Sequence, residues 1–329
     1  MDPALRLKLL DALVQPRHLL TLFARNAVLA IAGIELRLSH PLRIVWLWIL
    51  QPRTSRSVAM RKILLNGVEI AVQEQGSGDP ALVFLHYWGG SSRTWQEVID
   101  KLAASNRCIA YDRRGWGESG DDPHAKYSLD LLASDDLALV QTLQLEHYVL
   151  IGHSMGGKLV QLLASVNPLG LIGTVLVAPA PPNPQILAPE AHEMQKHAYD
   201  NAENVAGAIA FLTQRPLSET LRKRVIEDSL RGSVAAKYSW PNEIQFEDIA
   251  DAAEKIRVPT LILAGQNDRE RPVSAQMADV VSRIPGAELV VIPNAGHLLP
   301  LEAPGEVANA IRSFLGNLAQ RNSDSARRS

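Results

Sequence analysis

The segment Gly152-His153-Ser154-Met155-Gly156 places a serine between two glycines, one two residues before it and one two residues after it. An apolar run over residues 148–151 precedes this segment, and residues 158–164 repeat apolar side chains at helical spacing. The pattern predicts a strand, an abrupt turn and a helix, with Ser154 at the apex of the turn. Glycines are needed there because side chains would collide with neighbouring backbone in so sharp a turn. A serine hydroxyl presented in this way can serve as a nucleophile.

Residues Gly152–Gly157 resemble the nucleophile elbow of the α/β-hydrolase fold superfamily, matching its G-H-S-M-G-G form throughout. In the competing interpretation the serine lies in a tight strand-to-helix turn and the glycines serve packing only. A serine hydroxyl is a weak nucleophile at neutral pH, so it needs an adjacent base that a third group orients. The rest of the chain must therefore supply a base and an acid.

In the family that this chain resembles, the order along the sequence is nucleophile, acid, histidine. Asp268 follows the apolar run 261–264, and His297 follows the run 290–292 and Gly296, so the order holds. Asp268 has a competing interpretation as a helix N-cap, in which Glu270 would be the acid. The position of Asp268 directly after a strand and turn favours Asp268.

Two further histidines of the nine in the chain need an assignment. His153 flanks the serine, and we interpret it as structural. His86 ends an apolar strand and resembles the histidine of the family's H-G oxyanion motif, which shapes the loop and transfers no proton. Only His297 combines the right order with the right local context.

Attack on a carbonyl builds negative charge on its oxygen, which two preset donors must stabilise. By resemblance, one is the backbone N–H of Met155 and the other is that of Trp88, in the oxyanion hole. The family usually has glycine where Tyr87 stands. We therefore expect Tyr87 to alter the loop or to line the site as a substrate-binding residue. Residues 111–120 resemble the family's D-x-R-G-x-G-x-S loop, a structural turn beside the site.

The elements that must position these residues follow an alternating pattern from Met60 onward. Asn66-Gly67 between two alternating apolar runs predicts a β-hairpin over residues 61–72. Strands and helices then alternate, which predicts an α/β fold with a doubly wound, mostly parallel sheet. The predicted strands are 81–86, 107–111, 147–151, 172–177, 259–264 and 287–292. The predicted helices are 94–104, 128–143, 155–166, 273–284 and 304–318.

The alternation stops between residues 179 and 256, where prolines give way to helical patterns. We predict helices at 190–200, 202–214, 218–231 and 247–256, and this block resembles the family's inserted helical cap. The expected organisation is a hydrolase core of residues 60–182 and 257–318, a cap of 183–256 and a flexible tail of 319–329. The resemblance covers about residues 60–318.

Residues 1–59 differ in composition, with eight Lys or Arg against three Asp or Glu. Their uncharged runs fall short of the ~20 residues that a membrane-spanning helix needs. We expect an N-terminal extension that is either peripheral or an upstream stretch read as coding, and that the core does not need for folding. Contact with a membrane surface through Trp46 and Trp48 is an alternative interpretation.

The composition of the 329-residue chain limits the remaining classes of function and partner. A net charge of −2 gives no reason to expect a nucleic-acid partner. The single cysteine, Cys108, excludes a disulfide scaffold and a zinc site with several cysteine ligands, and its apolar surroundings predict a buried thiol. The sequence shows no metal constellation and no phosphate loop, so we expect no cofactor. We expect a cytoplasmic protein, and its oligomeric state stays open.

The sequence as a whole predicts a serine hydrolase that cleaves a carboxylic ester of a small organic substrate. Ser154 would attack, His297 would take the proton and Asp268 would orient the imidazole. Hydrolysis of lactones or of C–C bonds and perhydrolysis use the same triad, and they remain alternatives. A ligand sensor with negligible turnover is the alternative from another class.

Overall fold

The fold is known from a computed structural model that describes residues 60–326, with side chains described for residues 60–321. The predicted N-terminal extension, residues 1–59, and residues 327–329 of the predicted tail lie outside the described residues. Within that part of the chain, eight strands form one sheet in the order β1-β2-β4-β3-β5-β6-β7-β8. Their bounds are Met60–Leu65, Val68–Gln75, Ala81–Leu85, Cys108–Tyr111, Tyr148–His153, Leu171–Val177, Thr260–Gly265 and Glu288–Ile292 for β1 to β8.

The sheet is mostly parallel, as the alternation of elements predicts. β2 pairs antiparallel with β1 and with β4, and every later pairing is parallel. The predicted hairpin is confirmed, because Asn66 and Gly67 join β1 to β2 with positive φ values of 45° and 81°. Such values are what a two-residue type I′ turn requires, and glycine adopts them without strain.

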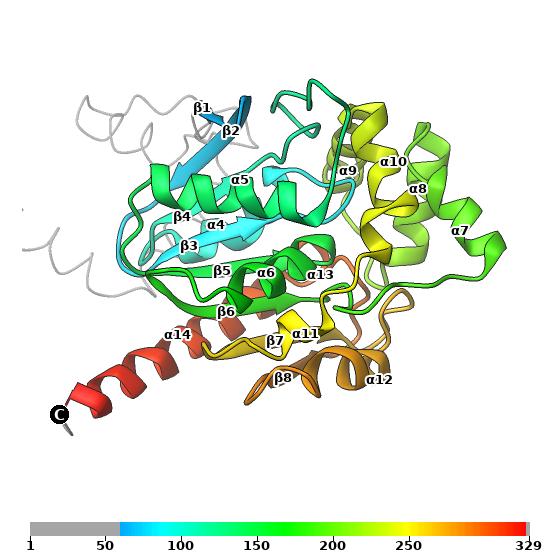
Figure 1. The fold of residues 1–329 in the computed structure, drawn as a ribbon. Helices are drawn as coiled ribbons and strands as arrows, with labels where there is room; N and C mark the ends of the chain where they lie inside the picture. The colour runs from blue at the N-terminus through cyan, green and yellow to red at the C-terminus, as the bar shows by residue number, and fades with distance from the viewer. Residues whose placement is uncertain (1–59, 327–329) are drawn as a thin grey trace, which may run out of the picture. The chain divides into compact units, whose positions relative to one another are not determined.

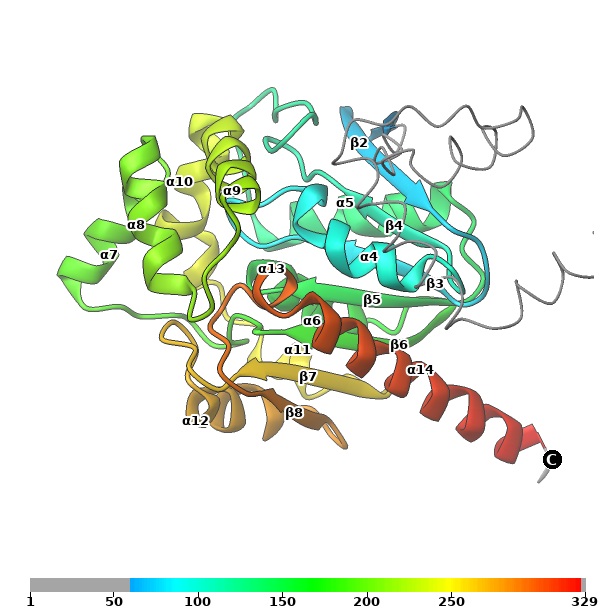
Figure 2. The ribbon, with the colours of Figure 1, turned by 180° about the vertical axis from the view of Figure 1, so that it is seen from behind.

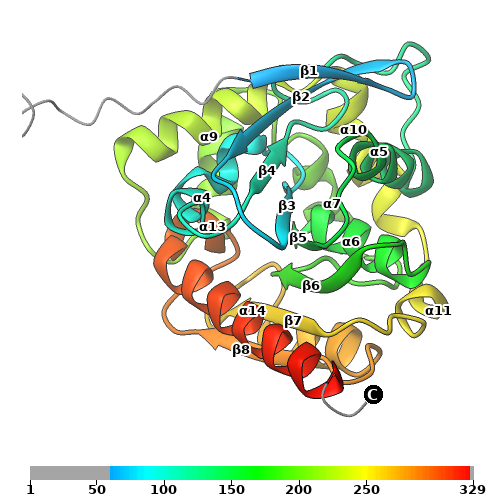
Figure 3. The same ribbon diagram turned by 90° about the vertical axis from the view of Figure 1, so that its left-hand side faces the viewer.

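Helices cover both faces of the sheet, because its central strands are apolar on both sides (Figures 1 and 2). In β3, Leu82 and Phe84 pack into one core cluster, and Val83 and Leu85 pack into the other. Figure 3 shows α4, α13 and α14 on one side of the sheet and α5, α6 and α11 on the other. These helices span Gln96–Leu102, Leu299–Glu302, Pro304–Ala326, Leu129–Thr142, Met155–Ser165 and Ala250–Ala253, in the order named. The doubly wound α/β class is therefore confirmed.

The segment between β6 and β7, residues 178–259, is mainly helical, and we call it the insert. Its longer helices lie together at one end of the sheet (Figure 1). They are α7 Pro189–Lys196, α8 Ala202–Leu212, α9 Glu219–Arg231 and α10 Val234–Asn242. Side chains of Asn201, Ser218 and Ser233 cap α8, α9 and α10 by accepting backbone N–H bonds. Three short helical turns complete the described chain, η1 Ser92–Trp95, η2 Ile244–Phe246 and η3 Met277–Val281, with α12 at Val273–Gln276.

The structure differs from the predicted helices in the insert and at the C-terminus. Helix α10 was not among the predicted helices, and it accommodates Pro241 near its end. The predicted helix 247–256 shortens to α11 because the backbone of Glu247 and Ile249 is committed to other partners. The carbonyl of Glu247 accepts from Lys158 Nζ, and the N–H of Ile249 donates to Pro182.

The last helix was predicted to end at residue 318, but α14 continues to Ala326. The polar residues that suggested a frayed end are compatible with an exposed helix. Arg321 on this extra part forms an ion pair with Glu288 on β8, at 3.0 Å. Part of the predicted tail is therefore helical.

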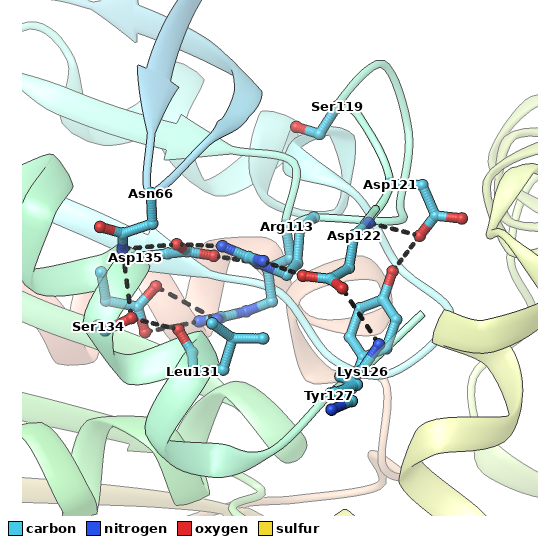
Figure 4. A network of polar contacts seen from close by, with 12 residues as sticks. Asn66, Arg113, Ser119, Asp121, Asp122, Lys126, Tyr127, Leu131, Ser134 and Asp135 are labelled. Atoms are coloured by element: carbon cyan, nitrogen blue, oxygen red, sulfur yellow. Dashed lines mark hydrogen bonds and ion pairs between the residues drawn. The ribbon is translucent and has the colours of Figure 1, made fainter. Parts of the chain in front are cut away.

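A buried ionic network joins the hairpin, the loop after β4 and helix α5 (Figure 4). The side chain of Arg114 is 1% exposed. Its guanidinium donates two 2.6 Å hydrogen bonds to Asp135 and one of 2.6 Å to Asp122. Asn66 in the hairpin turn donates to Asp135 at 2.9 Å. Beside this cluster, Arg113 pairs with Asp136. The network therefore fixes the loop after β4, in which the backbone N–H of Arg113 donates to His86.

We predict that Asp135→Asn destabilises the protein by about 3–5 kcal/mol, because it leaves the buried Arg114 charge incompletely compensated. The measurement is the free energy of unfolding from urea titration. Glu118→Gln is the control, since Glu118 pairs with Arg231 where both side chains are about half exposed. The control should cost about 0–1 kcal/mol. Equal costs for the two variants would contradict a structural role for the network.

Candidate active site

Ser154 lies at the turn between β5 and α6, where the sequence predicts it. Its backbone has φ 53° and ψ −114°, which is unfavourable for a residue with a side chain. Neighbouring backbone holds this conformation: the Ser154 N–H donates to Val177 at 3.0 Å, and its carbonyl accepts from Ala180 at 3.0 Å. From Ile151 to Val160, Ser154 alone is not buried. The turn therefore leaves this serine accessible among closely packed residues.

The predicted acid and base form a buried pair. His297 Nδ1 donates to Asp268 Oδ2 at 2.8 Å, and the two residues are only 3% and 4% exposed. The other carboxylate oxygen of Asp268 accepts from the backbone N–H of Glu270 at 2.9 Å and of Arg271 at 2.8 Å. Both oxygens of Asp268 are thus occupied, and the proton on Nδ1 leaves Nε2 of His297 as the basic nitrogen.

The same contacts determine the protonation of the pair. Burial lowers the pKa of His297, but the charge of Asp268 and its hydrogen bond raise it more, so the pKa lies above its ordinary value. Burial raises the pKa of Asp268, but the charge and hydrogen bond of His297 and the two backbone N–H groups outweigh it. The pKa of Asp268 is therefore lowered, which keeps the carboxylate ionised.

His153 and His86 differ from His297 in the direction in which their pKa values are shifted. Burial lowers the pKa of each to about 3, assisted by the charge of His297 for His153 and of Arg113 for His86. Both are therefore neutral at physiological pH. The Nε2 atom of His153 lies 2.8 Å from the carbonyl oxygen of His297 and donates to it. His153 thus helps to hold the backbone of the predicted base, a role that its place in the sequence does not indicate.

The loop after β3 contains the two other predicted site residues, Tyr87 and Trp88. His86 Nε2 accepts from the Arg113 N–H at 3.1 Å, so its Nδ1 carries the proton and donates to the Tyr87 carbonyl at 2.7 Å. Tyr87 is buried, with its ring 5.1 Å from the His153 ring. The structure thus places Tyr87 within the packing of the loop.

Met155 is the first residue of α6, where backbone N–H groups have no partner within the helix. The dipole of the helix adds partial positive charge at this end, so an oxyanion near the Met155 N–H would be stabilised. The indole of Trp88 donates to the Lys237 carbonyl in the insert at 2.9 Å. This bond fixes the side chain of Trp88 and leaves its backbone N–H as the predicted second donor.

Several residues around the site were missed by the sequence analysis. Glu302 Oε2 accepts from the backbone N–H of Gly296 at 3.0 Å and from those of Gln214 and Arg215. It thereby joins the loop of His297 to the segment after α8. The His297 N–H also donates to the Leu212 carbonyl, at 2.7 Å. No local pattern in the sequence marks a carboxylate that caps backbone groups from two distant segments.

Lys158 was also missed, because a lysine on a helix is usually exposed. It is fully buried on α6, four residues after Ser154. Its Nζ donates to the carbonyl of Glu247 at 2.6 Å and to that of Asn183 at 3.4 Å, and burial lowers its pKa to about 8. Lys158 thereby ties both ends of the insert to the helix that begins next to Ser154.

Among the described residues, no group of three or more His, Cys, Asp or Glu is placed to hold a metal ion. Between residues 60 and 326, no helix combines the length and the apolar character that a membrane span requires.

The pH dependence of turnover should report the Asp268–His297 pair. We expect activity to require neutral His297, because the predicted base must accept a proton, so kcat/KM should fall as pH decreases through a midpoint above the ordinary histidine value of about 6.5. Asp268→Asn removes the charge that raises this pKa. We therefore predict a midpoint at lower pH and a loss of roughly 10⁴-fold in kcat.

Glu270→Gln is the matched control, and it tests the alternative acid. The charge of Glu270 also raises the pKa of His297, but less than Asp268 does. We expect a small shift of the midpoint and nearly unchanged kcat. A larger loss in Glu270→Gln than in Asp268→Asn would make Glu270 the acid. The measurement is kcat/KM for a small ester between pH 5 and 9 in all three proteins.

Known proteins share this fold and part of this sequence. The non-heme haloperoxidase of Rhodococcus erythropolis is 29% identical over 249 residues, covering 70% of this chain and 90% of that protein. The bifunctional esterase/perhydrolase DCH of Acinetobacter calcoaceticus is 26% identical, over 76% of this chain and 97% of its own. The structure of an esterase from Exiguobacterium antarcticum has the same fold, with a TM-score of 0.73 at 23% identity over 78% of this chain and all of that one. The sequence model of the alpha/beta hydrolase family matches residues 82–310, and the chain therefore belongs to that family.

Proposed function

We propose that this protein is a serine hydrolase that cleaves a carboxylic ester of a small organic substrate through an acyl-enzyme on Ser154. The observation that carries the proposal is the buried hydrogen bond between His297 and Asp268. It supplies a base of fixed tautomer, and the His297 ring lies 5.3 Å from the ring of His153, the residue before the serine. Membership of the alpha/beta hydrolase family and the esterase among the relatives support the same reaction class.

In the proposed mechanism, Ser154 Oγ attacks the ester carbonyl while His297 Nε2 takes its proton. Asp268 holds the imidazole orientation and stabilises the imidazolium that forms. The backbone N–H groups of Met155 and Trp88 donate to the oxyanion of the tetrahedral intermediate. The alcohol leaves with the proton from His297, and a water activated by His297 then releases the acid and restores Ser154. Every step uses residues of this chain.

We further propose that residues 183–256 act as a helical cap that sets specificity. The insert contacts the loops of two proposed catalytic groups, through Leu212 at His297 and Lys237 at Trp88. A segment anchored at both places is well located to shape the substrate pocket.

Perhydrolysis is the second candidate, and the bifunctional esterase/perhydrolase and the haloperoxidase among the relatives favour it. The acyl-enzyme would be the same, and hydrogen peroxide in place of water would release a peracid and free Ser154. The two reactions differ only in the molecule that attacks the acyl-enzyme, which is water in hydrolysis and hydrogen peroxide in perhydrolysis. The ratio of peracid to acid formed in the presence of hydrogen peroxide distinguishes them.

Pre-steady-state hydrolysis of p-nitrophenyl acetate tests the acyl-enzyme. We expect a burst of about one equivalent of p-nitrophenol where deacylation limits the rate, followed by continued turnover. Ser154→Ala should reduce kcat by about four to six orders of magnitude with an unchanged melting temperature, because the three residues act as a unit. Ser165→Ala is the control on the same helix, since its hydroxyl donates to the Leu162 carbonyl within α6.

A single slow turnover without a steady state would show a ligand sensor and overturn the proposed hydrolase. Unchanged turnover in Ser154→Ala would overturn the assignment of the nucleophile. Assays over esters of graded acyl length and over lactones then define the substrate class. A preference for lactones by kcat/KM would overturn the ester proposal and leave the triad assignment intact.

A further inference from the structure

Two hydroxyl groups of the insert hold consecutive carbonyls of the loop after β3. The hydroxyl of Tyr199 donates to the Trp88 carbonyl at 2.8 Å, and that of Ser229 donates to the Gly89 carbonyl at 2.8 Å. Tyr199 lies between α7 and α8, and Ser229 lies on α9. Both residues are buried. The path of the loop at Trp88 thus depends on side chains more than a hundred positions later in the chain.

These bonds constrain the peptide planes on both sides of Trp88. The Trp88 N–H belongs to the same planar unit as the Tyr87 carbonyl, which accepts from His86 Nδ1 at 2.7 Å and from the Gly90 N–H at 3.0 Å. The next planar unit carries the Trp88 carbonyl, which Tyr199 holds. One unit is therefore fixed from within the loop and the other from the insert.

The packing around Tyr199 supports this arrangement. Its ring lies 4.2 Å from the Trp88 ring, centroid to centroid. Gly89 has φ 88°, and a Cβ atom there would lie 2.3 Å from the Tyr199 ring. Glycine at position 89 thus lets the tyrosine lie against the loop. Burial raises the pKa of Tyr199 well above its usual range, so the hydroxyl remains protonated and can donate.

Helix α9 holds the far end of the same loop. The carboxylate of Asp228, which is buried, accepts from Ser91 Oγ at 2.8 Å and from Arg93 Nε at 2.9 Å. Ser91 in turn caps η1, which follows the loop. The loop is therefore held by the insert at Trp88, at Gly89 and at Ser91.

We propose that Tyr199 is a positioning residue for the oxyanion hole: by holding the Trp88 carbonyl, it restrains the peptide unit that follows Trp88 and so limits movement of the adjoining unit, which carries the Trp88 N–H. This inference rests on the proposed function, in which that N–H is a donor. It assigns part of the rate acceleration to the insert, in addition to specificity. Ser229 assists by holding the next carbonyl.

Loss of the Tyr199 hydroxyl should therefore destabilise the transition state without weakening the binding of the ester in the ground state. Removal of a whole oxyanion donor costs about 10²–10³-fold in kcat. Loss of the group that orients a donor should cost less, roughly 10-fold, and should leave ground-state binding of the ester nearly unchanged. An inhibitor that forms an oxyanion on Ser154 should lose affinity in parallel with kcat/KM, because it uses the same donors.

The test compares Tyr199→Phe with Tyr238→Phe in the full chain. Phenylalanine keeps the ring contact with Trp88 and removes only the hydroxyl. Tyr238 is the matched control, because it also belongs to the insert and its hydroxyl donates to the side chain of Asp200 at 3.0 Å rather than to a carbonyl of the loop. The measurements are kcat and KM for p-nitrophenyl acetate between pH 6 and 9, and Ki for an aryl trifluoromethyl ketone.

For Tyr199→Phe we expect kcat about 10-fold lower at every pH, KM within about twofold, and Ki raised about as much as kcat/KM falls. Tyr238→Phe should match the unsubstituted protein. Ser229→Ala provides a second variant if Tyr199→Phe folds poorly, and it should change kcat and Ki in the same direction. Ser239→Ala is its control, since that hydroxyl bonds the Ala236 carbonyl within α10.

Unchanged kcat and Ki in folded Tyr199→Phe and Ser229→Ala would overturn the inference. A loss that falls on KM alone would also overturn it, because such a loss indicates a role in substrate binding. If the unsubstituted protein neither turns over the ester nor binds the ketone, the proposed function and this inference fail together. If the unsubstituted protein turns over the ester and binds the ketone, and the variants behave like it, this inference fails and the proposed function stands.

Discussion

The backbone turn at Ser154 is the constraint on which the rest of the structure depends. A residue with a side chain at φ 53° and ψ −114° is strained, and such strain persists only where surrounding structure imposes it. The surroundings leave little space: a Cβ atom at Gly152 would lie 2.3 Å from the Gly156 carbonyl oxygen, and one at Gly156 would lie 2.4 Å from the Leu85 carbonyl oxygen. The close packing of β5, α6 and β3 is possible only because these positions are glycine.

Because β5 lies between β3 and β6, the segments that follow the central strands begin near this turn. The loop of Trp88 follows β3, and the insert follows β6. Lys158, Leu212 and Tyr199 then join the insert to α6, to the loop of His297 and to the loop of Trp88. The insert thus contacts the helix that begins next to Ser154, the loop of His297 and the loop of Trp88. This connection gives a physical reason to expect that changes in the insert alter rate as well as specificity.

The fold and the candidate site differ in how far the sequence could predict them. The glycines around Ser154, the apolar strands and the loops that carry Asp268 and His297 are local patterns, and the structure brings Asp268 and His297 together in a hydrogen bond. Contacts such as Tyr199 with the Trp88 carbonyl leave no such pattern, because a hydroxyl can bond any carbonyl that the fold brings near.

The errors in the insert have the same origin. The helical pattern of residues 247–256 is real, but tertiary contacts of Glu247 and Ile249 override its first part. In α10, the capping bond of Ser233 and the packing of Trp240 support a helix that Pro241 argues against. Local sequence thus predicts elements well where burial on the sheet determines them and less well where distant polar groups do.

The central claim is that Ser154 becomes covalently acylated, and labelling with a fluorophosphonate tests it most directly. The reagent reacts with a serine only where a base activates it and an oxyanion hole stabilises the adduct. Intact-mass spectrometry and peptide mapping should show one adduct per chain, located on Ser154 and absent in Ser154→Ala. An adduct on a different serine, or ester hydrolysis that persists without any adduct, would contradict the assignment of Ser154 as the nucleophile.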